Sequence, residues 1–128
     1  MSLFSKKQTG DAGEDYCVKY LKKKGCKIIA RNYRKPYGEI DIIALQDKVL
    51  CFVEVKTRRQ GSQTRPYEAV TLQKQMRIAR TAQTYLNETG AEFFCRFDVC
   101  EVIIDPDTLK PSDIYYIENA FEADSSLF

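Results

Sequence analysis

The sequence predicts an α/β sandwich in which helices cover a mixed central sheet, and three observations indicate this fold. The chain has 128 residues, close to the commonest size of a single domain. Hydrophobic residues make up 44% of it, which is enough for a core. Its apolar patterns follow the order helix, three strands, helix, two strands, which is typical of a sheet packed against helices. We expect one domain over residues 1–120 and a flexible acidic tail over residues 121–128.

Residues 11–24 are expected to form the first helix. Apolar side chains recur on one side of this segment at helical spacing, namely Ala12, Tyr16, Cys17, Tyr20 and Leu21. Acidic residues near its start and lysines near its end suit the helix dipole, and Gly25 then stops the helix.

Three strands are expected next, over residues 26–34, 39–45 and 49–57. The Pro-Tyr-Gly sequence at 36–38 breaks the chain between the first two. Residues 46–48 form a tight turn, so the second and third strands make a hairpin.

A polar loop over residues 58–66 leads into a long helix over residues 67–88. The expected core stripe of this helix is Leu72, Met76, Ala79, Ala82 and Leu86. Residues 92–104 predict a long apolar strand. Pro111 then breaks the chain, and residues 114–117 form a short last strand.

Composition narrows the class of protein. No apolar run is long enough to span a membrane, and the N-terminus lacks the apolar stretch of a signal peptide, so a cytoplasmic protein is expected. Five cysteines without a Cys-x-x-Cys pair, and no histidine, argue against zinc. Residues 1–91 hold 18 Lys and Arg against nine Asp and Glu, whereas residues 92–128 hold two against nine. The basic part suits an anionic partner such as nucleic acid; the alternative is a solvated mixed-charge surface.

Three charged residues interrupt the apolar strands of the predicted hairpin. Glu54 and Lys56 are two residues apart in one strand, so they project to the same face. A turn centred at residues 47–48 places Asp41 opposite Glu54, where the two carboxylates repel each other. A divalent cation such as Mg²⁺ would remove that repulsion. Lys56 would orient or deprotonate an attacking water, or offset negative charge on a transition state. The residues themselves therefore predict phosphodiester hydrolysis.

A purely structural interpretation of the same residues stays open. Glu54 and Lys56 would form a salt bridge at the edge of the sheet, and Asp41 would cap a turn. A register slip of one residue would also point Asp41 to the other face.

The Asp41, thirteen-residue, Glu54-Val55-Lys56 pattern resembles the PD-(D/E)XK nucleases, although Ile40 stands where that motif has proline. The chain is most similar to their bacterial YraN-type family. The matching stretches are Gly-Asp-Ala-Gly-Glu at 10–14, Gly-Glu-Ile-Asp-Ile-Ile-Ala at 38–44, Phe-Val-Glu-Val-Lys-Thr-Arg at 52–58 and Arg-Phe-Asp-Val at 96–99. The resemblance implies a restriction-endonuclease-like three-layer α/β/α sandwich. It also implies a Mg²⁺- or Mn²⁺-dependent endonuclease acting on DNA, branched DNA included, as in the similar archaeal Holliday junction resolvases, for which a homodimer is expected.

The resemblance also assigns roles. Asp41 and Glu54 would bind the metal, Lys56 would be the catalytic lysine, and Glu14 would match an extra catalytic glutamate of resolvase-like members. The alternative for Glu14 is compensation of the helix dipole in the first turn. Glu39 points the same way as Asp41. It would either contact the metal-binding residues without binding the metal itself, or pair with Arg34 or Arg58.

The expected nucleic-acid contacts are basic side chains near the site: Arg58, Arg59, Arg65, Lys74 and Arg77. Tyr37 and Tyr67 are candidates for stacking on unpaired bases, with packing as the alternative. Arg96 and Asp98 are expected to form a structural ion pair.

Two rival functions remain open at this stage. The first is a catalytically silent nucleic-acid-binding module that keeps the fold, and the second is a scaffold that uses the acidic tail. The intact set of Asp41, Glu54 and Lys56 favours the nuclease.

Overall fold

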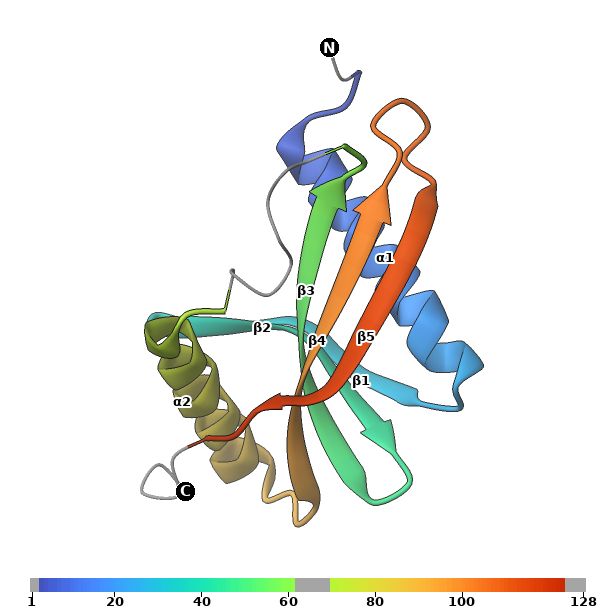
Figure 1. Ribbon diagram of the computed structural model, residues 1–128. Coiled ribbons are helices and arrows are strands. Elements are labelled where there is room, and N and C mark those ends of the chain that lie inside the picture. The colour runs from blue at the N-terminus through green and yellow to red at the C-terminus, as the bar shows by residue number, and fades with distance from the viewer. Residues whose placement is uncertain (1–2, 62–69, 124–128) are drawn as a thin grey trace.

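The computed structural model describes residues 3–61 and 70–123, and it confirms the predicted α/β class and the order of the elements. The helices are α1 (Lys6–Lys23) and α2 (Leu72–Thr89). The strands are β1 (Lys27–Lys35), β2 (Gly38–Gln46), β3 (Val49–Arg59), β4 (Phe94–Ile104) and β5 (Pro111–Phe121). Two helices therefore pack on a five-stranded sheet (Figure 1).

The sheet is mixed because one pair of neighbouring strands is parallel. The strand order is β1-β2-β3-β4-β5, and every neighbouring pair is antiparallel except β3 and β4, which are parallel. Parallel neighbours need a long crossover, and the segment containing α2 supplies it.

Each face of the sheet carries one helix and one apolar cluster, giving three layers (Figure 1). Helix α1 buries Cys17, Val18 and Leu21 against Ile42 and Val53 of the sheet. On the other face, α2 packs against a second set, which includes Ile40, Ile43, Phe52, Ile78 and Phe97. Nearly continuous apolar sequence in β2 and β3 follows from this double covering.

The first helix begins five residues earlier than the sequence predicted. Ser5 is its N-cap: the Ser5 Oγ accepts from the amide of Gln8, and the Gln8 side chain accepts from the amide of Ser5. This capping box outweighs the acidic residues that suggested a start at residue 11. As a result, Glu14 lies in the third turn of α1, and the first turn holds no acidic residue.

The second helix begins at Leu72, with Thr71 as N-cap. It ends at Thr89, and its C-cap Gly90 has the left-handed conformation. Residues 67–69 of the predicted helix lie outside the described residues. Leu72 and Met76 were expected in the core, but they are 73% and 54% exposed, so that expectation was wrong. Ala79 and Ala82 are buried as predicted, and Ile78 and Thr81 are buried beside them. The buried stripe therefore lies further round the helix than predicted at its N-terminal end.

The last strand is longer than predicted. Pro111 begins β5 instead of ending a segment, because a first-strand position needs no amide donor. The strand runs to Phe121, whose ring stacks on Phe97 with centroids 5.1 Å apart. The sheet thus passes the boundary expected at residue 120, while residues 124–128 lie outside the described part.

Two glycines of α1 should respond oppositely to alanine. A Cβ at Gly13 would lie 2.0 Å from Thr57 Oγ1 and 2.9 Å from Thr57 Cβ, so Gly13→Ala should push the helix away from β3 and cost about 1–3 kcal/mol. A Cβ at Gly10 meets nothing within 4 Å, so Gly10→Ala should stabilise the helix by about 0.5–1 kcal/mol. Urea unfolding of both variants measures the difference, and equal effects would contradict the close packing at Gly13.

Candidate active site

The β2–β3 hairpin brings Asp41 next to β3 in the way that the turn predicted. The register runs from Gln46↔Val49 to Ile42↔Val53, so the next pair along would be Asp41 and Glu54. The ladder ends there. Asp41 Oδ2 instead accepts a hydrogen bond of 2.8 Å from the Val55 amide. The predicted register is therefore confirmed, and the Asp41 carboxylate replaces a main-chain partner at the point where the strands separate.

Glu54 is 6% exposed and is held by two lysines. Its Oε1 lies 2.6 Å from Lys74 Nζ and 3.3 Å from Lys56 Nζ. The ion pair with Lys56 matches the structural alternative for this strand, but Lys74 comes from α2, on the face where Glu54 projects. Glu54 thus joins the sheet to the helix through two cations.

The environment of Asp41 disfavours a second negative charge. Burial, and then the negative charge of Glu54, raise the pKa of Asp41 to about 7, against the opposing effect of the Val55 amide. The two carboxyl groups are close enough to hydrogen bond when one holds a proton, and this also raises the pKa. Around neutral pH, a proton or another cation would therefore relieve the repulsion between the two carboxylates.

Lys56 is a partly desolvated amine. Burial, and then the neighbouring ammonium of Lys74, lower its pKa, while the charge of Glu54 acts in the opposite direction. Its side chain is 14% exposed and its Nζ lies 3.3 Å from Glu54 Oε1, but Lys56 is not among the residues that line the cleft of Asp41 and Glu54. A lysine in such a position gives up its proton more easily than one at the surface.

The carboxylates suit a hard divalent cation. Asp41, Glu54 and Glu39 line one cleft of about 450 Å³ that also contains Lys74 and Arg77. The described residues contain no group of three or more His, Cys, Asp or Glu side chains arranged for a metal. Two carboxylates are, however, the usual protein contribution to a Mg²⁺ site, where water and phosphate oxygens complete the shell. The donor set fits Mg²⁺ or Mn²⁺ and lacks the nitrogen and sulfur ligands that zinc takes.

Glu39 and Glu14 have partners other than those of Asp41 and Glu54. The Glu39 carboxylate lies 3.3 Å from Arg34 Nε, which was one of its expected partners. Glu14 is buried beneath α1, where it accepts from Arg31 Nε at 2.9 Å and Asn32 Nδ2 at 3.0 Å. It does not line the cleft of Asp41 and Glu54. Its position in the third turn also rules out the role in dipole compensation.

The candidate nucleic-acid contacts divide into several places. Lys74 is part of the cleft and neutralises Glu54, and Arg77 lines the same cleft. Arg58 is partly buried. Burial raises the pKa of Glu101, and the positive charge of Arg58 acts in the opposite direction. Arg59 donates to the Phe4 carbonyl at 3.2 Å. Arg65 and Tyr67 lie outside the described residues.

Sequence reasoning missed the contact between Lys74 and Glu54. The helical pattern showed that Lys74 lies off the expected stripe of α2, but not which side of that helix faces β3. The predicted pair of Arg96 and Asp98 is present, with Nε–Oδ1 at 2.8 Å and Nη2–Oδ2 at 3.0 Å. It lies apart from the cleft and is structural.

The comparison with known proteins identifies the family. The model described as "Uncharacterised protein family UPF0102" matches residues 13–102. The chain belongs to the UPF0102 family. That match spans most of α1 and β4 and all of β1, β2, β3 and α2, and it includes Asp41, Glu54 and Lys56.

Individual UPF0102 proteins align over nearly the whole chain. One from Alkaliphilus metalliredigens is 48% identical over 116 residues, covering 90% of this chain and 98% of the relative. One from Prosthecochloris aestuarii is 48% identical over 119 residues, covering 90% and 94%. One from Caldanaerobacter subterraneus subsp. tengcongensis is 40% identical over 122 residues, covering 94% and 100%.

Proposed function

We propose that this UPF0102 protein is a Mg²⁺- or Mn²⁺-dependent nuclease that hydrolyses phosphodiester bonds in DNA, with branched DNA among its substrates. The observation that carries the proposal is that Asp41 and Glu54 line one cleft, with Lys56 Nζ 3.3 Å from the Glu54 carboxylate. Burial and the charge of Glu54 raise the pKa of Asp41, and a divalent cation would relieve the repulsion between the two carboxylates. The proposal places the chain in the PD-(D/E)XK superfamily with a restriction-endonuclease-like fold.

Each residue then has a defined task. Asp41 and Glu54 would hold the metal, which would polarise a phosphate oxygen and ease the deprotonation of the attacking water. The Val55 amide fixes one oxygen of Asp41, so the carboxylate has a set orientation. Lys74 Nζ, 2.6 Å from Glu54 Oε1, holds the Glu54 side chain in position. Hydrolysis consumes one water, breaks one P–O bond and yields a phosphate monoester and a hydroxyl group.

Lys56 is the proposed catalytic lysine. Its ammonium form offsets negative charge on the phosphoryl group, and its lowered pKa leaves more of it as the neutral amine, the form that can accept a proton, than in an exposed lysine. Replacing Lys56 with alanine is expected to lower the cleavage rate about 10²–10⁴-fold. DNA affinity should change little in this variant, because Lys56 acts on the reacting phosphate. Lys56→Arg keeps the charge but cannot give up a proton, so its activity separates the two roles.

The second candidate is a nucleic-acid-binding module without chemistry. One observation favours it: Glu54 already has two cationic partners and is neutralised without a metal.

No helix within residues 3–61 and 70–123 is long and apolar enough to cross a membrane. A cytoplasmic location and a homodimer remain part of the proposal.

A cleavage assay tests the choice. Purified protein would be incubated with linear duplex, single-stranded and four-way-junction DNA, with Mg²⁺, with Mn²⁺ or with EDTA. Asp41→Ala and Lys56→Ala would run beside it, and Lys22→Ala, an exposed lysine of α1, would serve as the control. The nuclease is supported if cutting needs the metal, is lost in Asp41→Ala and Lys56→Ala, and is retained in Lys22→Ala. Binding without cutting on all three substrates would favour the silent module.

A further inference from the structure

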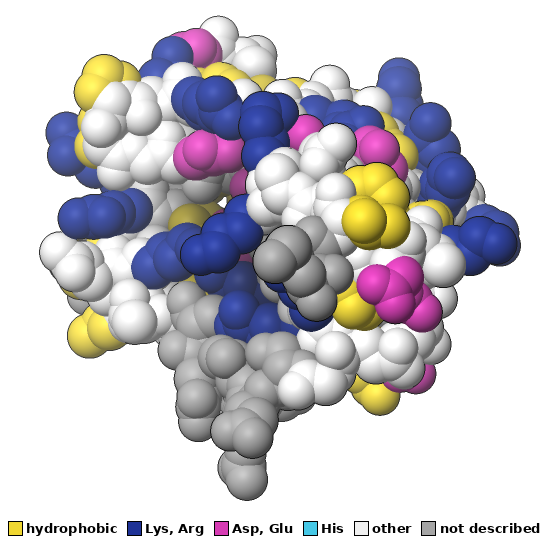
Figure 2. Space-filling model, turned by 90° about the horizontal axis from the view of Figure 1, so that it is seen from above, with side chains coloured by type: hydrophobic (Ala, Val, Ile, Leu, Met, Phe, Trp, Pro, Cys, Tyr) yellow, Lys and Arg dark blue, Asp and Glu magenta, His cyan; other side chains and the backbone are white. Residues whose placement is uncertain are grey.

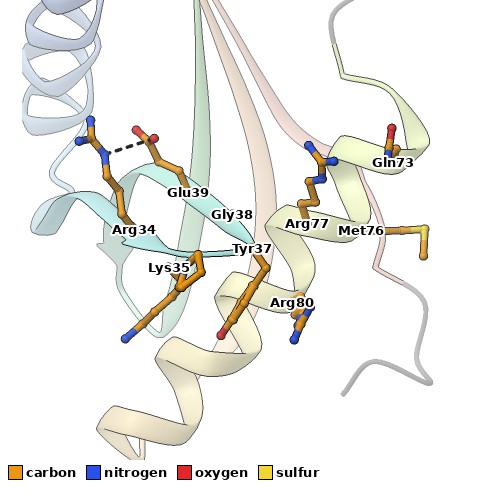
Figure 3. A pocket seen from close by; sticks show the side chains of 10 residues that line it. Arg34, Lys35, Tyr37, Gly38, Glu39, Gln73, Met76, Arg77 and Arg80 are labelled. Carbon is orange, nitrogen blue, oxygen red and sulfur yellow. Dashed lines mark ion pairs between the residues drawn. The ribbon is translucent and has the colours of Figure 1, made fainter.

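A groove runs from the candidate cleft along α2. It lies between this helix and the turn that joins β1 to β2, and its volume is about 820 Å³ (Figure 3). The groove shares four lining residues with the cleft that contains the two carboxylates: Gly38, Glu39, Gln73 and Arg77. The two hollows are therefore adjacent, and a ligand long enough to leave one would reach the other.

Two of the four basic side chains that line the groove are already neutralised. Arg34 Nε lies 3.3 Å from Glu39 Oε2, and Lys35 Nζ lies 2.5 Å from Glu88 Oε1. Both cations come from β1 and face carboxylates on other elements. They contribute little net charge to the groove.

The other two basic side chains, Arg77 and Arg80, have no anionic partner among the described residues. They are three residues apart on α2, so they share one side of the helix and are separated by about 4.5 Å along its axis. Seen from above, Lys and Arg side chains gather around a hollow in the surface (Figure 2). The groove thus carries uncompensated positive charge next to the candidate metal site.

Arg80 is held in place by an aromatic ring. Its guanidinium carbon lies 3.9 Å from the centroid of the Tyr37 ring, and the Tyr37 hydroxyl hydrogen bonds with Thr84 Oγ1. Stacking covers one face of the guanidinium and leaves its N–H edges for an anion. Because Tyr37 is fixed to α2 at both its face and its hydroxyl, Arg80 is ordered before a ligand arrives, which lowers the entropy cost of binding.

We propose that this groove binds the phosphodiester backbone of the strand that enters the cleft, with Arg77 and Arg80 each contacting one phosphate. The inference rests on the proposed function for its choice of nucleic acid as the ligand. Contacts of this kind are independent of base sequence and weaken with salt. Met76, 54% exposed beside the two arginines, adds apolar surface for a base. An unpaired strand and one strand of a duplex offer the same phosphate chemistry.

Binding is measured without metal, so the result does not depend on catalysis. Fluorescence anisotropy of labelled single-stranded and duplex DNA, in EDTA over a range of KCl concentrations, gives the slope of log K against log salt. Removing two phosphate contacts with Arg77→Gln/Arg80→Gln should lower that slope by about 1.4 for single strands and about 1.8 for duplex. Lys22→Gln/Lys23→Gln removes the same charge from the far end of α1 and should leave the slope unchanged. An unpaired strand is the bound form if the full change of about 1.4 appears with single-stranded DNA and little change appears with duplex, and the reverse result indicates one strand of a duplex.

The outcomes separate this inference from the proposed function. Equal slopes for the wild type and the arginine variant, or equal losses in the arginine and lysine variants, would overturn the groove. A wild type that binds neither DNA would overturn it as well. A wild type that cuts DNA with metal while the arginine variant binds normally would keep the nuclease and reject the groove. Binding that depends on the two arginines, without any cutting, would support the groove and reject the nuclease.

Discussion

Replacing Asp41 with asparagine is expected to stabilise the metal-free protein at pH 8 while removing its response to divalent metal. The folded-state pKa of Asp41 is raised to about 7 from an ordinary value of 3.8, because the group is buried and faces Glu54. Its contribution to stability is therefore complete below about pH 4 and is lost as the pH rises through about 7. Asparagine cannot ionise and escapes this loss. Its side-chain oxygen can still accept from the Val55 amide.

The expected gain in unfolding free energy is on the order of 2 kcal/mol at pH 8. This is about half of what the full rise in the pKa of Asp41 would give, because solvent screens part of the interaction. Urea unfolding in EDTA at pH 5 and pH 8 measures it. The variant should have a higher free energy of unfolding than the wild type at pH 8, and the two values should be closer at pH 5. Millimolar Mn²⁺ should then raise the melting temperature of the wild type and not that of the variant. A variant that is less stable at pH 8 would show that the Asp41 charge is already compensated in the metal-free protein.

The second large effect concerns the ion pair of Arg96 and Asp98. Asp98 is 0% exposed, and besides Arg96 it accepts from the Tyr116 hydroxyl at 2.6 Å and the Asn119 amide at 2.9 Å. Replacing Arg96 with methionine leaves a buried carboxylate without its cation and should cost about 3–5 kcal/mol of unfolding free energy.

Two further variants make the explanation specific. Adding Asp98→Asn to Arg96→Met removes the unpaired charge and should recover most of the stability. Arg34→Met breaks the exposed pair with Glu39 and should cost less than about 1 kcal/mol. Chemical denaturation of the set checks both expectations. A loss from Arg96→Met no larger than that from Arg34→Met would mean that the buried pair contributes nothing beyond a surface contact.

Local patterns predicted the strands around the site better than the helices. The polar segment at residues 46–48 is short and separates two apolar runs, so it indicated the register that places Asp41 next to β3. The start of α1 depended on the reciprocal bonds of Ser5 and Gln8, which lie outside the apolar stripe used to find the helix. Sequence reasoning that begins from apolar spacing therefore finds the body of a helix and misses a polar start.

The partners of the charged residues depended on how elements dock. Spacing along β3 gave the contact of Glu54 with Lys56, because both lie in one strand. The contact with Lys74 and the pairing of Glu14 with Arg31 each join a helix to the sheet. The rotation of a helix about its axis is decided by packing, as the exposed Leu72 shows, so these two contacts could not be predicted from the sequence.

The central claim is that Asp41 and Glu54 bind a divalent metal, and an equilibrium titration with Mn²⁺, followed by the electron paramagnetic resonance signal of the free ion, tests it most directly. The wild type should bind about one ion per chain at pH 8. Affinity should be about tenfold lower at pH 6, because protons then compete for Asp41, whose pKa is about 7. Asp41→Asn and Glu54→Gln should both lose the site, and Lys22→Gln should retain it. A wild type that leaves all the Mn²⁺ free at pH 8, or carboxylate variants that bind it as tightly as the wild type, would contradict the claim.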